Sequence, residues 1–410
     1  MLSPLRWKET CIRLLPYIPY VNPKPSSSVT LPEDVLRLIS QYYVESVLAQ
    51  PKTVRQLRRR RKEYWSAIAP LAKASPQLWK IVCEIWRMIW ATCCSVRCLS
   101  QCHGGRLSPV IRILTLGEDW EPETLNLTAL TKLENLSIDY HKLLYYDQPS
   151  RQLRILPGVK SLPPSLRRLE ILHFHGPAED LFPLINSCPK LVELRLVQCT
   201  MFNNPKCMLW RVNAHNHYLV GHRRDDAINC ANTLANHIQG LPHLERFHAH
   251  QYLTNLDSVY QHRLEHKRHH PPGHRDRTDP VDGVTMHNIL QLAALAPQDA
   301  PPINPALPRL ADKKLWAVSC PQCQRELEEP IEAAERLVAS LLSAKHKSLK
   351  AVSFPSFLSP GRTAPSEWMV EHEYVQDRLV IWTQRPTCGR PRQRYRCEFV
   401  RHGSQWLLGQ

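Results

Sequence analysis

The apolar positions near the start of the chain have the period of a helix. Six of them recur at three- and four-residue steps and therefore share one helical face: Val35, Leu36, Ile39, Tyr42, Tyr43 and Val47. Pro32 suits a first helical turn, where its missing N–H is not needed, and the two acidic residues after it complement the helix dipole. The pattern predicts a helix from Leu31 to just before Pro51.

Two more helices are predicted in YWSAIAPLAKASPQLWKIVCEIWRMIW, residues 64–90, which Pro70 and Pro76 divide into a short and a long segment. The long segment carries a wide apolar stripe formed by Leu78, Val82, Ile85, Trp86, Ile89 and Trp90. Together with the helix that begins at Leu31, these two helices predict a small helical domain over residues 31–104, after a poorly ordered lead over residues 1–30.

After about residue 105 the hydrophobic period becomes that of short strands. PVIRILTLGED, KLENLSIDYH, SLRRLEILHFHG and KLVELRLVQC each carry the register L-x-x-L-x-L or a close relative of it. Leu114 and Leu136 are 22 residues apart, and Leu169 and Leu194 are 25 apart, which are steps typical of leucine-rich repeats. The longer step from Leu136 to Leu169 predicts an insertion around residues 145–157.

Later segments extend this pattern. LPHLERFHA, around Leu244, looks like a degenerate unit, while LWAVSCPQC (315–323) and LKAVSFPSF (349–357) share L-x-A-V-S-x-P at an offset of 34 residues. Between them, a predicted amphipathic helix has the apolar side Ile331, Ala334, Leu337, Val338, Leu341 and Leu342. We therefore predict an α/β chain whose residues 105–385 form an irregular leucine-rich-repeat solenoid of short parallel strands and helices. The tail over residues 386–410 has no periodicity, and no fold is predicted for it.

Composition adds limits on class and compartment. Hydrophobic content of 43% and charged content of 22% are ordinary for a soluble globular protein, and the formal charge of +16 leaves a polyanionic partner open. The first twenty residues make a poor signal peptide, and no apolar run is long enough to span a membrane. We expect 14 reduced cysteines and a location in the cytoplasm, the nucleus or both, with no membrane partner.

The stretch LPEDVLRLI resembles the first helix of the F-box motif, L-P-x-x-[VL]-L-x-x-I, and LAKASPQLWKIV echoes the second half of that motif. Two departures are present. An arginine-rich insertion of about twenty residues separates the halves, and Trp79 falls one position later than the usual serine-to-tryptophan spacing. The chain as a whole resembles the F-box proteins with leucine-rich-repeat tails that are abundant in fungi, over residues 31–92 and 107–385.

This resemblance implies a non-catalytic substrate receptor of a cullin-type ubiquitin ligase. Its helical domain would bind a Skp-type adaptor, and through it a cullin, and its repeat region would bind a protein substrate that the sequence does not identify. The implied adaptor-binding residues are Leu31, Pro32, Val35, Leu36, Ile39, Leu71, Leu78 and Trp79. A surplus apolar face on a small helical domain supports the same hypothesis, because such a face marks an interface.

Two other functions remain open at this point. The first is a leucine-rich-repeat scaffold unrelated to ubiquitin, in which the N-terminal helices cap the repeats. The second is a basic nucleic-acid-binding protein that uses the clusters Arg58–Lys62 and His262–Pro280, although a solvated connection is favoured for the first cluster and a disordered insertion for the second. Because GxGxxG, GxxxxGK[ST], GxSxG and HExxH motifs are all absent, we expect no enzyme and no cofactor.

Clusters of cysteine and histidine are the remaining candidates for a metal site. Cys320 and Cys323 form a single CxxC, whereas a structural zinc site needs four ligands. The repeat register aligns Cys199 and Cys320 with Phe354, so this slot predicts buried apolar cysteines. A solvated loop is favoured for the His262–His274 tract, and small apolar packing residues for Cys94, Cys98, Cys102 and the adjacent His103. We therefore predict no metal site.

Overall fold

The computed structural model describes residues 31–49, 61–93, 111–117, 127–141, 144–147, 152–155, 161–200, 203, 207, 219–254, 324–356, 365–375, 378–385, 394–402 and 405–409. Its described residues fall into two compact units, of which the first ends at Ile89 and the second begins at Trp90. The candidate segments 94–103, 262–280 and 315–323 lie outside the described residues. Among the helices that are described, none has the length and apolarity needed to cross a membrane.

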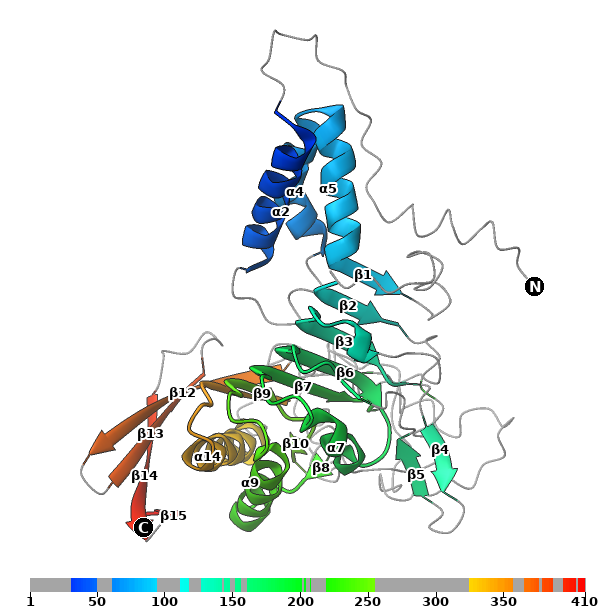
Figure 1. Ribbon diagram of the computed structural model, residues 1–410. Helices are drawn as coiled ribbons and strands as arrows, with labels where there is room; N and C mark the ends of the chain where they lie inside the picture. The colour runs from blue at the N-terminus through cyan, green and yellow to red at the C-terminus, as the bar shows by residue number, and fades with distance from the viewer. Residues whose placement is uncertain are drawn as a thin grey trace, which may run out of the picture. The chain divides into compact units, whose positions relative to one another are not determined.

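The described part of the first unit comprises three helices, as predicted: α2 (Glu33–Ala49), α4 (Arg61–Lys73) and α5 (Pro76–Ile89) (Figure 1). Ser75 caps α5, because its Oγ accepts a hydrogen bond from the backbone N–H of Leu78 at 3.1 Å. Two details differ from the prediction. Pro70 lies inside α4 with its ring exposed instead of ending the helix, and Trp90 begins a strand instead of completing the stripe of α5.

The second unit is a mixed α/β fold built on a large, mostly parallel sheet. Its strands lie in the order β1-β2-β3-β6-β7-β9-β11-β12-β13-β14-β15. The parallel ones are β1 (Trp90–Cys93), β2 (Ile113–Leu116), β3 (Asn135–Asp139), β6 (Arg168–Phe174), β7 (Glu193–Gln198), β9 (Arg246–His248) and β11 (Ala351–Pro355). The pairing of β1 with β2 explains why this unit starts at Trp90, earlier than the boundary near residue 104 that the sequence suggested.

The register of the parallel strands agrees with the repeat spacing. Leu114 pairs with Leu136, and Leu136 pairs in turn with Leu169. The same row continues across the sheet to Leu194, Phe247 and Val352. All these described side chains are buried in one continuous core, so the predicted alignment of Leu114, Leu136, Leu169 and Leu194 is confirmed, and the structure adds Phe247 and Val352 to the row.

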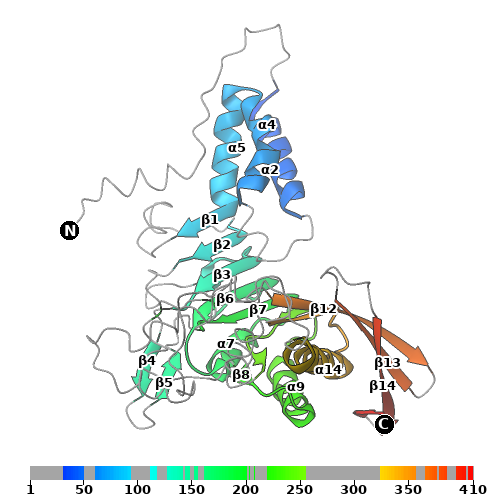
Figure 2. The same cartoon turned by 180° about the vertical axis from the view of Figure 1, so that it is seen from behind.

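Three α-helices and two small two-stranded sheets are described beside the parallel strands. Helices α9 (Arg224–Ile238) and α14 (Glu329–Lys345) lie side by side in both views (Figures 1 and 2), with the short α7 (Phe182–Ile185) nearby. Helix α14 is the predicted amphipathic helix, whereas α9 was not predicted. The predicted insertion is a hairpin of β4 (Leu144–Asp147) and β5 (Gln152–Ile155). A second small sheet pairs β8 (Leu219–Val220) with β10 (Tyr252–Leu253).

The C-terminal strands were missed from the sequence. After β11 the sheet continues antiparallel through β12 (Pro365–Val375), β13 (Arg378–Gln384), β14 (Arg394–His402) and β15 (Gln405–Leu408). The last two lie in the tail for which no fold was predicted. Its signal was a short alternation of Tyr395, Cys397 and Phe399 between polar residues, which is typical of a strand with one buried face.

Candidate functional site

Helix α2 and the residue just before it expose an apolar stripe, which we call the α2 stripe. Its members recur at helical steps of three and four residues and share one face. Their exposed fractions are 45% for Leu31, 39% for Val35, 67% for Leu38, 46% for Ile39 and 78% for Tyr42. A row of large apolar side chains that one helix exposes in this way is an unusual surface for a monomer.

The opposite face of α2 packs against the other helices of its unit. Ser40 and Val44 are fully buried there, and Leu36 and Val47 are half-buried. This arrangement corrects the sequence analysis, which placed Val35 and Leu36 on one common face. Val35 is exposed, whereas Leu36 is half-buried on the side of α2 that carries Ser40 and Val44.

The eight residues that the F-box resemblance implies all retain exposed surface. Leu31, Pro32, Val35 and Ile39 are exposed, and Leu36, Leu71, Leu78 and Trp79 are half-buried. The ring of Trp79 meets that of Trp65 edge-on, with 6.0 Å between the centroids. The buried part of Trp79 therefore contributes to helix packing, and its remaining surface is available to a partner.

An exposed ion-pair network lies on the side of α2 opposite the α2 stripe. The Nη2 of Arg37 lies 3.4 Å from a carboxylate oxygen of Glu33 and 3.1 Å from one of Glu84. The Glu84 contact is the main cause that raises the pKa of Arg37. Because Glu84 belongs to α5, this contact links α2 to α5.

A second feature is a groove in the other unit, at the amino-terminal ends of the parallel strands. Its volume is about 740 Å³. The groove is lined by two carboxylates, those of Glu134 and Glu245. It is also lined by five basic side chains: Arg112, Lys132, Arg167, Lys190 and His243. The groove therefore has an excess of positive charge and suits an acidic ligand.

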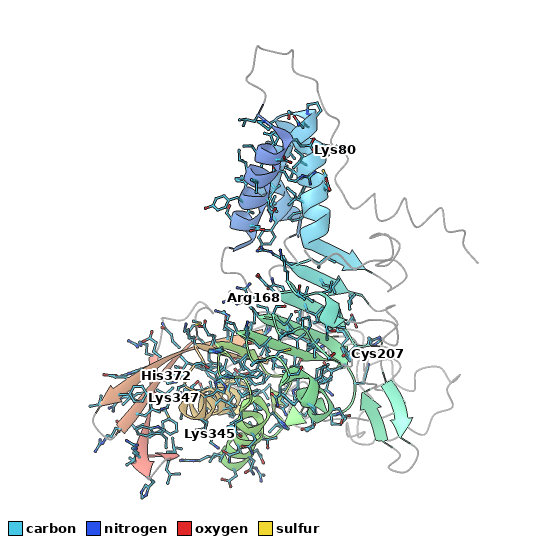
Figure 3. All side chains as sticks on the ribbon, in the orientation of Figure 1. Lys80, Arg168, Cys207, Lys345, Lys347 and His372 are labelled. Atoms are coloured by element: carbon cyan, nitrogen blue, oxygen red, sulfur yellow. The ribbon has the colours of Figure 1, made fainter. Side chains whose placement is uncertain are left out.

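A third feature lies at the opposite, carboxyl-terminal ends of the strands, and we call it the His–Cys cluster. It comprises His141, His175, Cys199 and Cys207, whose nitrogen and sulfur atoms all lie within 4.8 Å of one another. Figure 3 shows Cys207 at this end of the sheet and Arg168, the first residue of β6, at the other end. The Sγ of Cys207 is 3.2 Å from the Nε2 of His141 and 3.6 Å from that of His175.

The His–Cys cluster is closed to solvent except at His141. His175 and Cys199 are fully buried, Cys207 is 5% exposed, and His141 is half-buried. The pKa of the Cys207 thiol is lowered, chiefly by its hydrogen bond with Cys199 and then by His141 and His175, although burial acts the other way. The cluster thus favours a thiolate, which is the form of cysteine that binds metals.

The sequence analysis missed the His–Cys cluster. It correctly placed Cys199 among the buried residues. It expected apolar neighbours around Cys199, whereas the structure places the Cys199 sulfur beside two histidines and a second cysteine. A signal was present, because His175 and Cys199 each follow the last residue of a strand directly and His141 follows β3 by two residues. Parallel strands bring such positions to one edge of a sheet.

The two surfaces and the His–Cys cluster have no counterpart from which a role can be transferred. No protein-family model matches the sequence, and the comparisons with curated proteins and with solved structures found no match either.

Proposed function

We propose that this protein is the non-catalytic substrate-recognition subunit of a Skp/cullin/F-box-type ubiquitin ligase. In this proposal the α2 stripe binds the Skp-type adaptor, and the repeat region binds a protein substrate. The observation that carries the proposal is the exposure of Leu31, Val35 and Ile39, the three apolar positions of the F-box-like motif that are not needed inside the helical unit.

The free energy of burial favours a partner on the α2 stripe. Removing apolar surface from water is worth roughly 25 cal/mol per Å², so five large exposed side chains represent several kcal/mol of available binding energy. Their helical spacing suits docking against an apolar groove of another protein. The scaffold alternative assigns the surface of Leu31–Ile39 to the repeat strands, and binding of a purified adaptor separates the two hypotheses.

The second unit supports the substrate-binding half of the proposal. Seven parallel strands follow one another in sheet order, and an aligned row of apolar side chains repeats across six of them, Leu114 to Val352. We interpret this part as an irregular leucine-rich-repeat solenoid, an architecture that presents extended binding surfaces. The basic groove at the strand ends is the surface that we assign to substrate, and its charge selects an acidic protein segment.

A ligase subunit of this kind performs no bond chemistry itself. It holds the substrate close to a ubiquitin-charged enzyme and so raises the effective concentration of an acceptor lysine. The basic groove can select the substrate through its charge without any catalytic group.

The adaptor proposal is tested by binding of a purified Skp-type adaptor to the full chain. Ile39→Asp introduces a charge into the α2 stripe and is expected to weaken binding at least about a hundredfold, since a charge buried unpaired at an interface is costly. Gln41→Asp is the matched control, because it places the same side chain two residues away on α2, outside the stripe. Leu36→Asp is a poorer probe, since Leu36 is half-buried against the other helices and its change would also disturb their packing.

Circular dichroism of both variants shows whether α2 still folds. Loss of binding in Ile39→Asp alone, with unchanged helicity, supports the proposal. Absence of binding by the unmodified chain, or equal binding by both variants, contradicts it.

A further inference from the structure

We propose that the His–Cys cluster is a structural zinc site with two nitrogen and two sulfur ligands: His141, His175, Cys199 and Cys207. This inference is independent of the adaptor proposal, because the cluster belongs to the other unit of the chain.

The ligand atoms have the spacing of a tetrahedral metal site. Zinc binds histidine nitrogen at about 2.0–2.1 Å and cysteine sulfur at about 2.3 Å, so the ligand atoms of a tetrahedron lie roughly 3.3–3.8 Å apart. The two distances from the Cys207 Sγ, 3.2 Å to His141 and 3.6 Å to His175, are close to this range. All four atoms lie within 4.8 Å of one another, so small side-chain movements would complete the tetrahedron.

A bulge in β6 aligns two of the ligands. Leu172 pairs with Val197, but Phe174 pairs with Gln198, so His173 and Phe174 together oppose a single residue of β7. His173 has a φ of 54°, a left-handed conformation that is uncommon for a residue with a side chain. The shift brings His175 level with Cys199, whereas an unbroken register would pair Phe174 with Cys199. Bulges often re-aim a side chain next to a functional site.

Polar contacts hold the surrounding backbone in place. The Oδ1 of Asp139 accepts a hydrogen bond from the backbone N–H of His141 at 3.0 Å, and its Oδ2 lies 2.8 Å from the Nδ1 of His173. After β7, the side chain of Asn203 accepts from the backbone N–H of Thr200 at 2.9 Å and donates to the carbonyl of Gln198 at 2.7 Å. These contacts fix the chain immediately before His141 and just after Cys199, as the supporting groups around metal ligands usually do.

The composition and burial of the cluster indicate the metal and its role. Two imidazoles and two thiolates suit zinc, and a site closed by four protein ligands is structural, because a catalytic zinc keeps one position open. Three of the four ligands are buried. The ion would fasten the segment that contains Cys207 to the ends of β3, β6 and β7.

The test is the zinc content of the full chain, purified under reducing conditions without chelators. We expect about one zinc ion per chain, as for a closed four-ligand site, and its loss in the double variant Cys199→Ser with Cys207→Ser. The matched control is Cys320→Ser with Cys323→Ser, which removes the CxxC pair and is expected to keep the ion. A second control, Cys188→Ser, changes a buried cysteine outside the cluster.

A measurement on the unmodified chain covers the case in which the serine variant does not fold. After removal of the zinc, addition of Co²⁺ is expected to produce the visible absorption of tetrahedral cobalt together with a thiolate-to-cobalt band in the near ultraviolet. The proposal is overturned if the reduced chain takes up neither zinc nor cobalt, if mass spectrometry finds a Cys199–Cys207 disulfide in protein kept reduced, or if only the Cys320/Cys323 variant loses the metal.

Discussion

The Sγ of Cys207 lies 3.2 Å from the Nε2 of His141, a residue 66 positions earlier in the chain. His141 follows β3, and Cys207 comes from the segment after β7, with β6 between these two strands in the sheet. The contact therefore depends on the assembled order of three neighbouring strands. It also shows how neighbouring parallel strands bring histidine and cysteine side chains together at their carboxyl-terminal ends.

Asp139 is expected to support the proposed zinc site through the backbone of His141. Asp139→Ala removes the acceptor for the His141 N–H and the partner of His173. Because loss of a supporting group beside a metal ligand typically costs about 10- to 100-fold in affinity, competition with a chromophoric chelator should show weaker zinc binding of that size. Asp225→Ala, on the first turn of α9, serves as control, and equal weakening by both variants would argue against a specific role for Asp139.

Two valines of α2 separate folding from binding. Val44 is fully buried and Val35 is 39% exposed on the same helix. Val44→Ala should lower the free energy of unfolding by about 2 kcal/mol, from lost apolar burial and the remaining cavity. Val35→Ala should change it by less than about 0.5 kcal/mol and yet weaken adaptor binding. Chemical denaturation followed by circular dichroism measures the change in the free energy of unfolding for both variants. A large loss of stability in Val35→Ala would mean that this side chain belongs to the core.

The start of α5 depends on Ser75. Its Oγ accepts the otherwise unpaired N–H of Leu78 at 3.1 Å, so Ser75→Ala should lower the stability of the helical unit by about 1 kcal/mol. Ser75→Asp keeps an acceptor at the cap and should retain most of the stability. Thermal unfolding of the three proteins tests the cap, and a common melting temperature for all of them would show that the hydrogen bond contributes little.

Glu335 is expected to make stability depend on pH. This residue of α14 is fully buried; its Oε2 accepts hydrogen bonds from Ser366 Oγ at 2.6 Å and Trp368 Nε1 at 3.0 Å. Burial raises the pKa of Glu335 above its ordinary value of 4.5, although hydrogen bonds from Ser356, Ser366 and Trp368 and the charge of Arg385 act in the opposite direction.

The sign of the effect follows from the raised pKa. Between the unfolded and the folded pKa the folded chain holds the proton more tightly, so this contribution to stability is complete below pH 4.5 and is lost as the pH rises through the folded pKa. Glu335→Gln cannot ionise and should gain stability relative to the unmodified chain as the pH rises above 4.5. Melting temperatures across that range measure the difference. The exposed Glu329→Gln on the same helix is the control, and parallel curves for Glu335→Gln and the unmodified chain would contradict the expectation.

Local hydrophobic periodicity was sufficient for much of the fold. The helices α2, α5 and α14 and the row from Leu114 to Leu194 could be predicted, because each apolar side chain repeats with the geometry of its own element. Strand β14 was missed because its few apolar residues alternate with charged ones, and β15 because it is only four residues long; β14 pairs with β13, and β15 pairs with β14.

The sequence by itself determined that α2, α5 and α14 are helices and that Leu114, Leu136, Leu169 and Leu194 take matching positions in short strands, since the period of apolar residues within each element shows this. Only the tertiary structure decided that Leu36 packs inward while Val35 stays exposed, because this depends on where the other helices lie. It alone also decided that a bulge at His173 brings His175 level with Cys199. Contacts between residues that are far apart in the chain require the whole sheet, and no local period encodes them.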